Sequence, residues 1–353
     1  MTDYKAGTFL FEEISSQGDA WAELIPIVLG QEQAICDLFA GVEAVVFTGC
    51  GTALNVSLTA APLFQMLTGI TASASPAAET FLFPTAALPH GKKVLVVLLS
   101  RSGKTTEVLR SLDYFQGHGF PTLGITCTAD SPLARASHLS LVLFPLVEQA
   151  VATTRSVTGM LLATQLITAI LSGNAAYLDE LQQLPEIFAA HHAEFHSLGK
   201  LLGETTSQTQ YTFVGNGPFY GLARESQYKI KELTLLPADS FPMFDFRHGP
   251  QSNVNKHMLI TAFLSDTARQ QETSLLKEMW SFGGRIWTVC EKADKRLKTY
   301  APHVLELRSN LSDLARLPLY LPAIQYMAYY RALSLGLNPD APRNLSYWVK
   351  IAG

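Results

Sequence analysis

The chain has 353 residues, a net charge of −4 and a hydrophobic fraction of 48%. This length accommodates two domains of ordinary size, and the composition supports large buried cores. No block of five like charges occurs, which argues against a nucleic-acid partner.

The cysteine pattern and the apolar stretches indicate in which cellular compartment the protein is found. Four cysteines are widely spaced without a CxxC pair, so the sequence predicts neither a metal site nor a disulfide framework. Met1–Lys5 lacks the basic start and apolar run of a signal peptide. The most apolar helical stretch, Val157–Leu171, is expected to be a core helix too short to span a bilayer. We therefore expect a cytoplasmic protein with no membrane contact.

The first half of the chain alternates strand-like and helix-like segments. Residues 1–35 are expected to form an N-terminal helical arm. Apolar runs typical of buried parallel strands follow it, with helical stretches after each. These runs are Ala44–Gly51, Val94–Leu99, Thr122–Cys127 and Leu139–Phe144.

A loop rich in hydroxyl groups separates the run Val94–Leu99 from a helix that starts near Glu107. It contains four hydroxyls, from Ser100, Ser102, Thr105 and Thr106, and it includes Lys104. In an open α/β sheet, ligands bind where a strand ends and a helix begins, and free N–H groups there favour an anion. The loop predicts a phosphate site; the alternative is an ordinary N-cap, which needs only one hydroxyl.

The second half repeats this order after a helix-rich stretch at about 172–207. Strand-like runs are expected at Tyr211–Gly217, Met258–Leu264, Arg285–Cys290 and His303–Leu307, and a helix is expected at Tyr220–Leu233. The repeat offsets are 166 from Gly49 to Gly215, 165 from Ser100 to Ser265 and 163 from Cys127 to Cys290. Near-constant offsets predict two tandem α/β domains, each with about five parallel strands.

The two copies differ at the loop that follows the second strand-like run. The second copy has Ser265-Asp266-Thr267-Ala268-Arg269 in place of the hydroxyl loop. The carboxylate of Asp266 would repel a phosphate. We therefore expect the first copy to hold the phosphate and the second copy to contribute other groups.

Two glutamates in the second copy are candidates for acid–base chemistry. Glu225 and Glu232 are seven residues apart on one predicted helix and share a face. Glu232 lies near the helix C-terminus, where the helix dipole disfavours an anion. The dipole would therefore make the Glu232 carboxylate a better proton acceptor. The alternative is a surface glutamate paired with a neighbouring lysine.

Histidines and glycines complete the candidate chemistry. His248 lies on a turn within Phe246–Pro250. Its imidazole can exchange protons near neutral pH; the alternative is a structural loop histidine.

Both Gly-x-Gly turns, at Gly49 and Gly215, lack the third glycine of a dinucleotide fingerprint, so a nicotinamide cofactor is not expected. A separate group is interpreted as surface or packing residues: His191, His192 and His196.

Six motifs in order resemble the sugar isomerase (SIS) family in its tandem form, which includes the isomerase half of glucosamine-6-phosphate synthase and the fructosamine-6-phosphate deglycases. They are Gly49–Thr52, Ser100–Thr105, Glu148 with Val151–Arg155, Glu225–Glu232, Arg247–Pro250 and Pro342–Leu345. The resemblance implies SIS domains at 36–172 and 208–340, a connector at 173–207 and a tail at 341–353 over the active site.

The resemblance also implies a role for each matching residue. The phosphate would be held by Ser100, Ser102 and Thr105, with Gly51 and Thr52 lining the same pocket. Sugar hydroxyls would be contacted by the segment with Val151 and Thr153. Glu232 would move a proton between C1 and C2 of the open-chain sugar, His248 would assist ring opening, and Glu225 would orient the site.

Two departures from the family pattern bear on the chemistry. Where the family tail has a lysine, this chain has Tyr347, and Lys350 is the candidate to replace that amine. Arg101 replaces a glutamine and would lie beside the phosphate or meet a substrate carboxylate.

The resemblance implies a cofactor-free enzyme that acts by enolisation on a 6-phosphorylated amino sugar or glycated amine. An isomerase, a deaminase and a deglycase all fit this description. A homodimer or larger assembly with sites at the interface is also implied. The alternatives are a plain aldose–ketose phosphosugar isomerase and a non-catalytic sugar-phosphate sensor.

Overall fold

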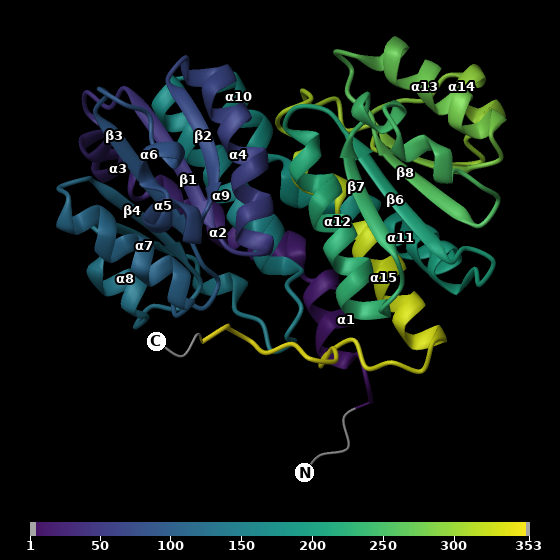
Figure 1. Cartoon of the computed structure of the whole chain (residues 1–353), viewed down its shortest axis with the longest axis horizontal. Helices are drawn as coiled ribbons and strands as arrows, with labels where there is room; N and C mark the ends of the chain where they lie inside the picture. Colours follow the sequence, from purple (N-terminus) through teal and green to yellow (C-terminus); the bar gives the residue numbers. More distant parts are fainter. Residues whose placement is uncertain (1–4, 351–353) are drawn as a thin grey trace. The chain divides into compact units, whose positions relative to one another are not determined.

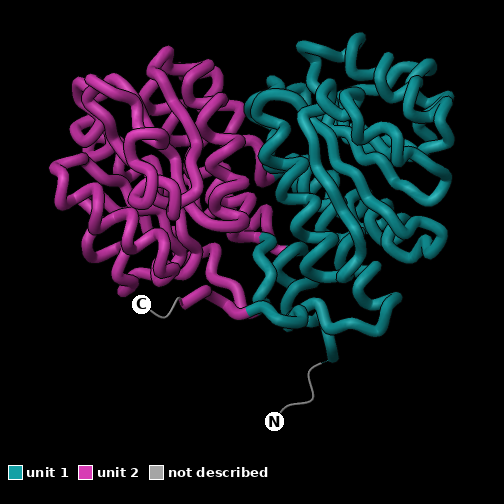
Figure 2. The backbone as a smooth tube through the Cα atoms, in the orientation of Figure 1, with its two compact units in different colours: residues 1–15, 150–154, 186–345 teal, residues 16–149, 155–185, 346–353 magenta. Residues whose placement is uncertain are grey.

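The computed structural model describes residues 5–350, and the chain divides into two compact units (Figures 1 and 2). The N-terminal sheet unit comprises residues 16–149, 155–185 and 346–353. The C-terminal sheet unit comprises residues 1–15, 150–154 and 186–345. The short segment 150–154 therefore belongs to a different unit from the residues on either side of it.

Each unit is built on one parallel five-stranded sheet flanked by helices, which confirms the predicted α/β fold with two sheets. The strand order is β2-β1-β3-β4-β5 in the first sheet and β10-β9-β8-β6-β7 in the second. The strands of the first sheet are β1 (Ala44–Gly49), β2 (Thr71–Pro76), β3 (Val94–Leu99), β4 (Thr122–Thr126) and β5 (Leu139–Val142). Those of the second are β6 (Gln210–Gly215), β7 (Ala238–Pro242), β8 (Met258–Phe263), β9 (Arg285–Cys290) and β10 (His303–Glu306).

The strands β2 and β7 have no counterpart among the predicted runs. Each forms an edge of its sheet, and each contains a terminal proline and several polar residues. Their registers match between copies, because Gly49 pairs with Pro76 and Gly215 pairs with Pro242. The offset of 166 residues thus extends to the edge strands.

The helices follow the strands in the order expected of βαβ crossovers. In the N-terminal sheet unit they are α2 (Gln17–Leu29), α3 (Glu32–Phe39), α4 (Thr52–Thr68), α5 (Ala77–Leu82), α6 (Pro84–Ala87), α7 (Thr106–Gly117), α8 (Pro132–Ala136), α9 (Arg155–Ser172) and α10 (Ala175–Gln182). In the C-terminal sheet unit they are α1 (Thr8–Ser15), α11 (Leu184–Glu204, apart from its first two residues), α12 (Phe219–Thr234), α13 (Arg269–Ser281), α14 (Lys295–Tyr300) and α15 (Pro322–Ser334).

The helix α9 is longer than the sequence pattern predicts. With 18 residues, the helix is long enough and apolar enough to cross a membrane, judged by length and composition only. The expectation that it is too short was therefore wrong. Of these residues, 78% are buried inside the structure. The helix packs against α4 and α2, as the core helix of a globular unit does.

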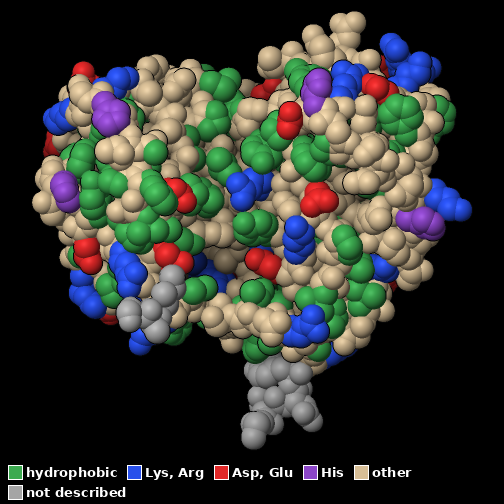
Figure 3. Space-filling model, in the orientation of Figure 1, with side chains coloured by type: hydrophobic (Ala, Val, Ile, Leu, Met, Phe, Trp, Pro, Cys, Tyr) green, Lys and Arg blue, Asp and Glu red, His purple; other side chains and the backbone are tan. Residues whose placement is uncertain are grey.

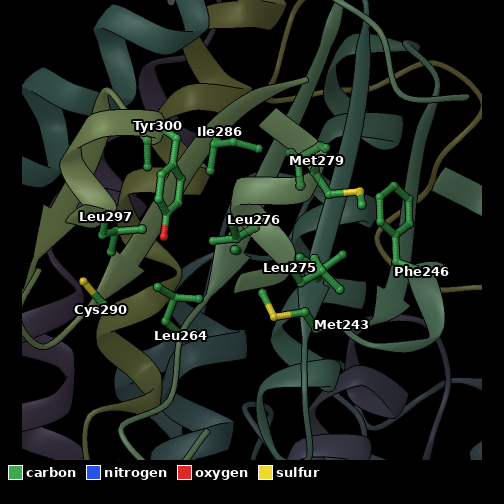
Figure 4. Close-up of a cluster of buried hydrophobic side chains, with 14 of the residues drawn as sticks. Met243, Phe246, Leu264, Leu275, Leu276, Met279, Ile286, Cys290, Leu297 and Tyr300 are labelled. Atoms are coloured by element: carbon green, nitrogen blue, oxygen red, sulfur yellow. The ribbon is translucent and has the colours of Figure 1, made fainter. Parts of the chain in front are cut away.

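One face of the second sheet carries a continuous apolar core (Figure 4). Side chains from β8 and β9 meet those of α13 and α14, including Leu276, Met279 and Ile286, and all three are fully buried. The same core reaches Met243 and Phe246 in the loop that precedes His248. This loop is therefore anchored by apolar side chains rather than held by the sheet alone.

The three helical histidines pack against aromatic rings as expected, and all three are hydrogen-bonded, with His191 Nδ1 3.4 Å from Glu194 Oε2. His192 Nε2 lies 2.8 Å from the hydroxyl of Tyr326, and His196 Nε2 contacts the hydroxyl of Tyr330. Charged side chains of both signs are interspersed on the face of the molecule shown in Figure 3.

Candidate functional site

The hydroxyl loop follows β3 in the centre of the first sheet and leads into α7. The side chains of Ser100 and Ser102 are almost fully buried, with 3% and 4% exposure. The Ser100 hydroxyl lies 3.2 Å from that of Thr105 and accepts from Gly103 N at 3.1 Å. Ser102 Oγ accepts from Lys104 N. The loop thus curls around its own hydroxyls at the N-terminus of α7, where the helix dipole favours an anion.

Gly103 makes this curl possible. Its φ is +60°, and a Cβ at this position would lie 2.1 Å from Ser131 Oγ. Any other residue would both adopt a strained backbone and clash with the wall of the loop. The turn is therefore specified by a glycine as well as by the hydroxyl residues.

The Gly-x-Gly turn after β1 lies on the adjacent strand of the same sheet. Gly51 has a φ of +57° and caps α4, whose first residue is the half-buried Thr52. Because β1 and β3 are paired neighbours, their carboxyl ends carry the turn and the hydroxyl loop at one edge of the sheet. Burial, with the nearby charge of Glu107, raises the pKa of the intervening Cys50 to about 12, so its thiol stays protonated.

Arg101 is nearly buried and already engaged. Its Nη1 donates to Glu148 Oε2 at 3.0 Å, and Glu148 also accepts from Ser156 N. Its Nη2 donates to the carbonyl of Tyr347, whose ring centroid lies 3.8 Å from the guanidinium carbon. The guanidinium is therefore neutralised by Glu148 and covered by the tail.

The tail residues that follow Tyr347 also lie on the hydroxyl loop. Lys104 Nζ lies 5.2 Å from the ring centroid of Trp348, and Thr106 N points to the carbonyl of Val349 at 3.5 Å. Lys350, the predicted substitute for a tail amine, is exposed.

The corresponding loop of the second sheet is filled by the protein's own carboxylates. Asp313 accepts from Asp266 N at 2.9 Å and from Thr267 N at 3.2 Å. Glu272 accepts from Ser265 N at 2.8 Å, and burial raises the pKa of Glu272. In the second copy, carboxylates thus take the donors that would face an anion.

The buried guanidinium of Arg316 completes this closed loop. It contacts Asp313 and lies 2.7 Å from Asp266 Oδ2, although it is fully buried. The prediction that Asp266 makes this loop a poor phosphate site is consistent with a loop that is closed by ion pairs.

The helix α12 carries an ion triad in its last three turns. The ammonium of Lys229, which is 1% exposed, lies 3.3 Å from Glu225 Oε1 and 2.7 Å from Glu232 Oε2. Burial by itself would lower the pKa of Lys229, but the carboxylates of Glu232 and Glu225 outweigh it and raise the pKa. Lys229 is therefore a buried cation that holds two carboxylates on one face of the helix.

Glu225 and Glu232 differ in access to solvent. The side chain of Glu225 is 2% exposed, whereas that of Glu232 is 25% exposed. Glu225 is suited to fixing the position of Lys229. Glu232 is suited to meeting a substrate while its charge is balanced by the same ammonium.

The segment 150–154 lies against this triad. Lys229 Nζ donates to Thr153 Oγ1 at 3.3 Å. The side chains of Val151 and Thr153 are half-buried, whereas Ala152 and Thr154 are buried. The structure thus brings together four residues: Glu225, Glu232, Thr153 and Lys229.

His248 is not connected to this group. It is exposed at the end of a 3₁₀ helix, Asp245–Arg247, and its backbone N–H donates to the carbonyl of Asp245. Within residues 5–350 its imidazole makes no hydrogen bond or ion pair. A catalytic role for His248 therefore stays a prediction.

Lys229 is the residue that the sequence reasoning did not single out. Its signal is present in the spacing, because it lies four residues after Glu225 and three before Glu232, where side chains on a helix meet. The alternative interpretation of Glu232, pairing with a neighbouring lysine, is what the structure has. This pairing is largely buried rather than solvated.

Comparisons with known proteins agree with this arrangement. The SIS domain family matches at residues 38–170 and 206–333. The glutamine–fructose-6-phosphate aminotransferase of Methanothermobacter thermautotrophicus is 25% identical over 97% of this chain and 57% of its own length. That of Pseudomonas aeruginosa is 27% identical over 97% of this chain and 59% of its own length. The chain thus spans less than two thirds of these relatives.

Two solved structures are similar over nearly the whole chain. Glucosamine-6-phosphate deaminase from Thermotoga maritima has a TM-score of 0.78 and 26% identity, and covers 97% of this chain and 99% of its own. The C-terminal domain of glucosamine-fructose-6-phosphate aminotransferase from Francisella tularensis has a TM-score of 0.85 and 24% identity, covers 96% of this chain and 99% of its own, and shows the fold. With two matched segments that cover most of its length, two parallel sheets and the hydroxyl loop in the first, this chain belongs to the SIS domain family.

Proposed function

We propose that this protein is a phosphosugar enzyme that deaminates a 2-amino-sugar 6-phosphate by enolisation. The observation that carries the proposal is the triad on α12, in which the buried ammonium of Lys229 lies 2.7 Å from the partly exposed carboxyl group of Glu232. A carboxylate in this setting can take a proton from carbon and return it.

The hydroxyl loop supports a phosphorylated substrate. Ser100, Ser102 and Thr105 lie at the N-terminus of α7, whereas Asp313 accepts from N–H groups of the corresponding loop in the second sheet. We assign the phosphate to this loop, with Gly51 and Thr52 beside it.

The reaction balances without any change of oxidation state overall. Ring opening, to which we assign His248, gives the aldehyde at C1. Glu232 takes the proton from C2, forming an enaminol, and returns it to C1, which leaves an imine at C2. Water adds to C2 and ammonia leaves, so the products are a ketose 6-phosphate and ammonia.

The state of Arg101 favours an amino sugar over a glycated amino acid. A deglycase substrate carries a carboxylate, and Arg101 was a candidate to bind it. Its guanidinium is instead paired with Glu148 and covered by Tyr347. The similarity to the Thermotoga maritima deaminase also supports deamination.

Turnover assays test the proposal. Glucosamine 6-phosphate, its C4 epimer and a fructosamine 6-phosphate are incubated separately with the protein, and ammonia, free amine and ketose phosphate are measured. We expect ammonia and ketose phosphate in equal amounts from an amino sugar. Glu232→Gln should lower kcat about 10²–10⁴-fold, as loss of a general base does. Glu194→Gln, on the exposed face of α11, should retain activity.

Each other outcome identifies an alternative. Ketose–aldose interconversion without ammonia release indicates a plain isomerase. Free amine from the fructosamine indicates a deglycase. Binding of sugar phosphates without turnover indicates a sensor, and full turnover by Glu232→Gln contradicts the mechanism.

The assembly is part of the proposal. If His248 of one subunit acts in the site of a second copy, mixing inactive Glu232→Gln and His248→Ala proteins should restore activity. Random exchange between dimers should recover about a quarter of the wild-type rate, because one site in each mixed dimer has both groups. No recovery after proven subunit exchange would place His248 in its own subunit's site or outside the chemistry.

A further inference from the structure

The segment 150–154 is held in the C-terminal sheet unit by hydrogen bonds from several elements. Val151 N donates to the carbonyl of Asp340 at 2.9 Å, and Gln325 Nε2 donates to the carbonyl of Thr154 at 3.1 Å. Lys229 donates to Thr153 Oγ1. This five-residue segment is thus bonded to three elements: α15, α12 and the chain after α15.

The helix α1 also bonds to this segment. Glu13, in its second turn, is 4% exposed, and its Oε1 accepts from Ala150 N at 3.1 Å. Ala150 itself is fully buried. A charged acceptor on a buried N–H forms a stronger bond than a neutral one, so this contact defines where the segment enters the unit.

The helix α1 is itself fixed to the same region. The carboxylate of Asp340 accepts from Gly7 N at 2.9 Å and from Leu10 N at 2.8 Å, at the start of α1. Asp340 thus binds α1 through its side chain and the segment through its carbonyl. Glu13 and Asp340 thus accept hydrogen bonds from the backbone N–H groups of the consecutive residues Ala150 and Val151.

We propose that Glu13 is a positioning residue, which holds Val151–Thr153 in register with the Lys229–Glu232 pair so that this segment can bind the sugar. This inference rests on the proposed function. Its physical basis is that Thr153 and Glu232 both accept a hydrogen bond from the ammonium of Lys229. A shift of the segment would therefore move Thr153 away from the cation that also binds the proposed base, Glu232.

Two substitutions separate charge from hydrogen bonding. Glu13→Gln keeps an acceptor for Ala150 N, whereas Glu13→Met has a similar length without one. We expect Glu13→Met to raise amide exchange across residues 150–154 and to lower kcat/KM for the amino-sugar phosphate, each about tenfold, as loss of one buried hydrogen bond to a charged group does. Glu13→Gln should stay within about threefold of wild type in both measurements.

Gln17→Met is the matched control. Gln17, at the start of α2, is also fully buried and accepts from Thr158 Oγ1 at 2.6 Å; it belongs to the N-terminal sheet unit, whereas residues 150–154 belong to the C-terminal one. We expect Gln17→Met to lower the melting temperature by a similar amount while leaving exchange in residues 150–154 and kcat/KM near wild-type values.

The outcomes distinguish this inference from the proposed function. Unchanged exchange in Glu13→Met, or an activity loss in Gln17→Met equal to that in Glu13→Met, overturns the positioning role. Faster exchange in Glu13→Met without a fall in kcat/KM also overturns it. If wild type turns over no sugar phosphate, the proposed function fails. The positioning role is then tested by calorimetry: equal binding of sugar phosphate to wild type and to Glu13→Met would overturn it as well.

Discussion

The guanidinium carbon of Arg101 lies 3.8 Å from the ring centroid of Tyr347, although 246 residues separate them. These are two positions at which the chain departs from the pattern of the SIS family it resembles. A cation next to the hydroxyl loop and an aromatic ring in the tail contact each other, so the two departures form one structural feature.

Removing the ring should release the tail from the loop. Tyr347→Ala loses the cation–π contact, which contributes about 0.5–2 kcal/mol at a partly desolvated site. We expect faster amide exchange in residues 346–350, measured by mass spectrometry. Tyr347→Phe keeps the ring and should exchange like wild type; equal exchange in the Ala variant would show that other contacts hold the tail.

Neutralising Lys229 should destabilise the protein strongly. Lys229→Met leaves Glu225, which is 1% exposed, as a buried carboxylate without this cation, and breaking a buried ion pair from one side costs about 3–5 kcal/mol. Urea unfolding measures this loss. Lys200→Met is the control, because Lys200 pairs with Glu204 at 3.9 Å on an exposed face and should change stability by less than about 1 kcal/mol.

The two copies of the serine after the central strand should respond differently to substitution. Ser100→Ala should weaken binding of glucose 6-phosphate about 10–100-fold, because a hydrogen bond to a charged group contributes about 1.5–3 kcal/mol. Ser265→Ala should lower stability, since Ser265 Oγ donates to buried Glu272, without changing that affinity. Calorimetry with glucose 6-phosphate measures both, and equal weakening in both variants would contradict the assignment of the phosphate to the first loop.

Removing Asp313 should open the closed loop of the second sheet. Asp313→Ala deprives Asp266 N, Thr267 N and the buried Arg316 of their carboxylate and should cost about 1–3 kcal/mol. Inorganic phosphate should restore part of the melting temperature in a saturable way, because the donors remain. Asp313→Asn keeps an acceptor, so its melting temperature should fall less and phosphate should raise it less. A fall in the melting temperature of Asp313→Ala that phosphate does not reduce at all would show that the loop collapses.

One carboxyl group should contribute to stability only above acidic pH. Burial opposes ionisation of Glu306, but the N–H of Ala293 and the side chains of Arg308 and Lys298 outweigh it and lower its pKa from 4.5 to about 2. A lowered pKa means that the stabilisation is present above about pH 4.5 and is lost as the pH falls through about 2. The stability difference between wild type and Glu306→Gln, measured in urea at several pH values, should shrink over that interval. A difference that is constant from pH 6 to pH 2 would contradict this assignment.

Local patterns were sufficient for the strands of the sheet interior and for the loops at their ends. Apolar runs such as Val94–Leu99 are buried along their whole length because both faces of a parallel sheet are covered, so the pattern identifies them without knowledge of their partners. Hydroxyls after one run, and an acid after its counterpart, similarly distinguished the two loops from sequence alone.

The ion triad was only partly predictable. Glu225 and Glu232 were identified from their helical spacing, and Lys229 has the same spacing. Burial decides which interpretation holds, because the same three residues on an exposed face would contribute little. Burial of Lys229 depends on what packs over α12, which helical periodicity does not specify.

The sequence by itself determined two similar βαβ halves, the loop that has the chemistry for phosphate, and the helix that has the carboxylates, because each depends on residues that are neighbours along the chain. Tertiary structure alone decided that β2 and β7 form sheet edges, that Asp313 closes the loop at Asp266, and that residues 150–154 join the C-terminal sheet unit. These features depend on hydrogen bonds between residues far apart in sequence, whose pairing is set by how the whole chain packs.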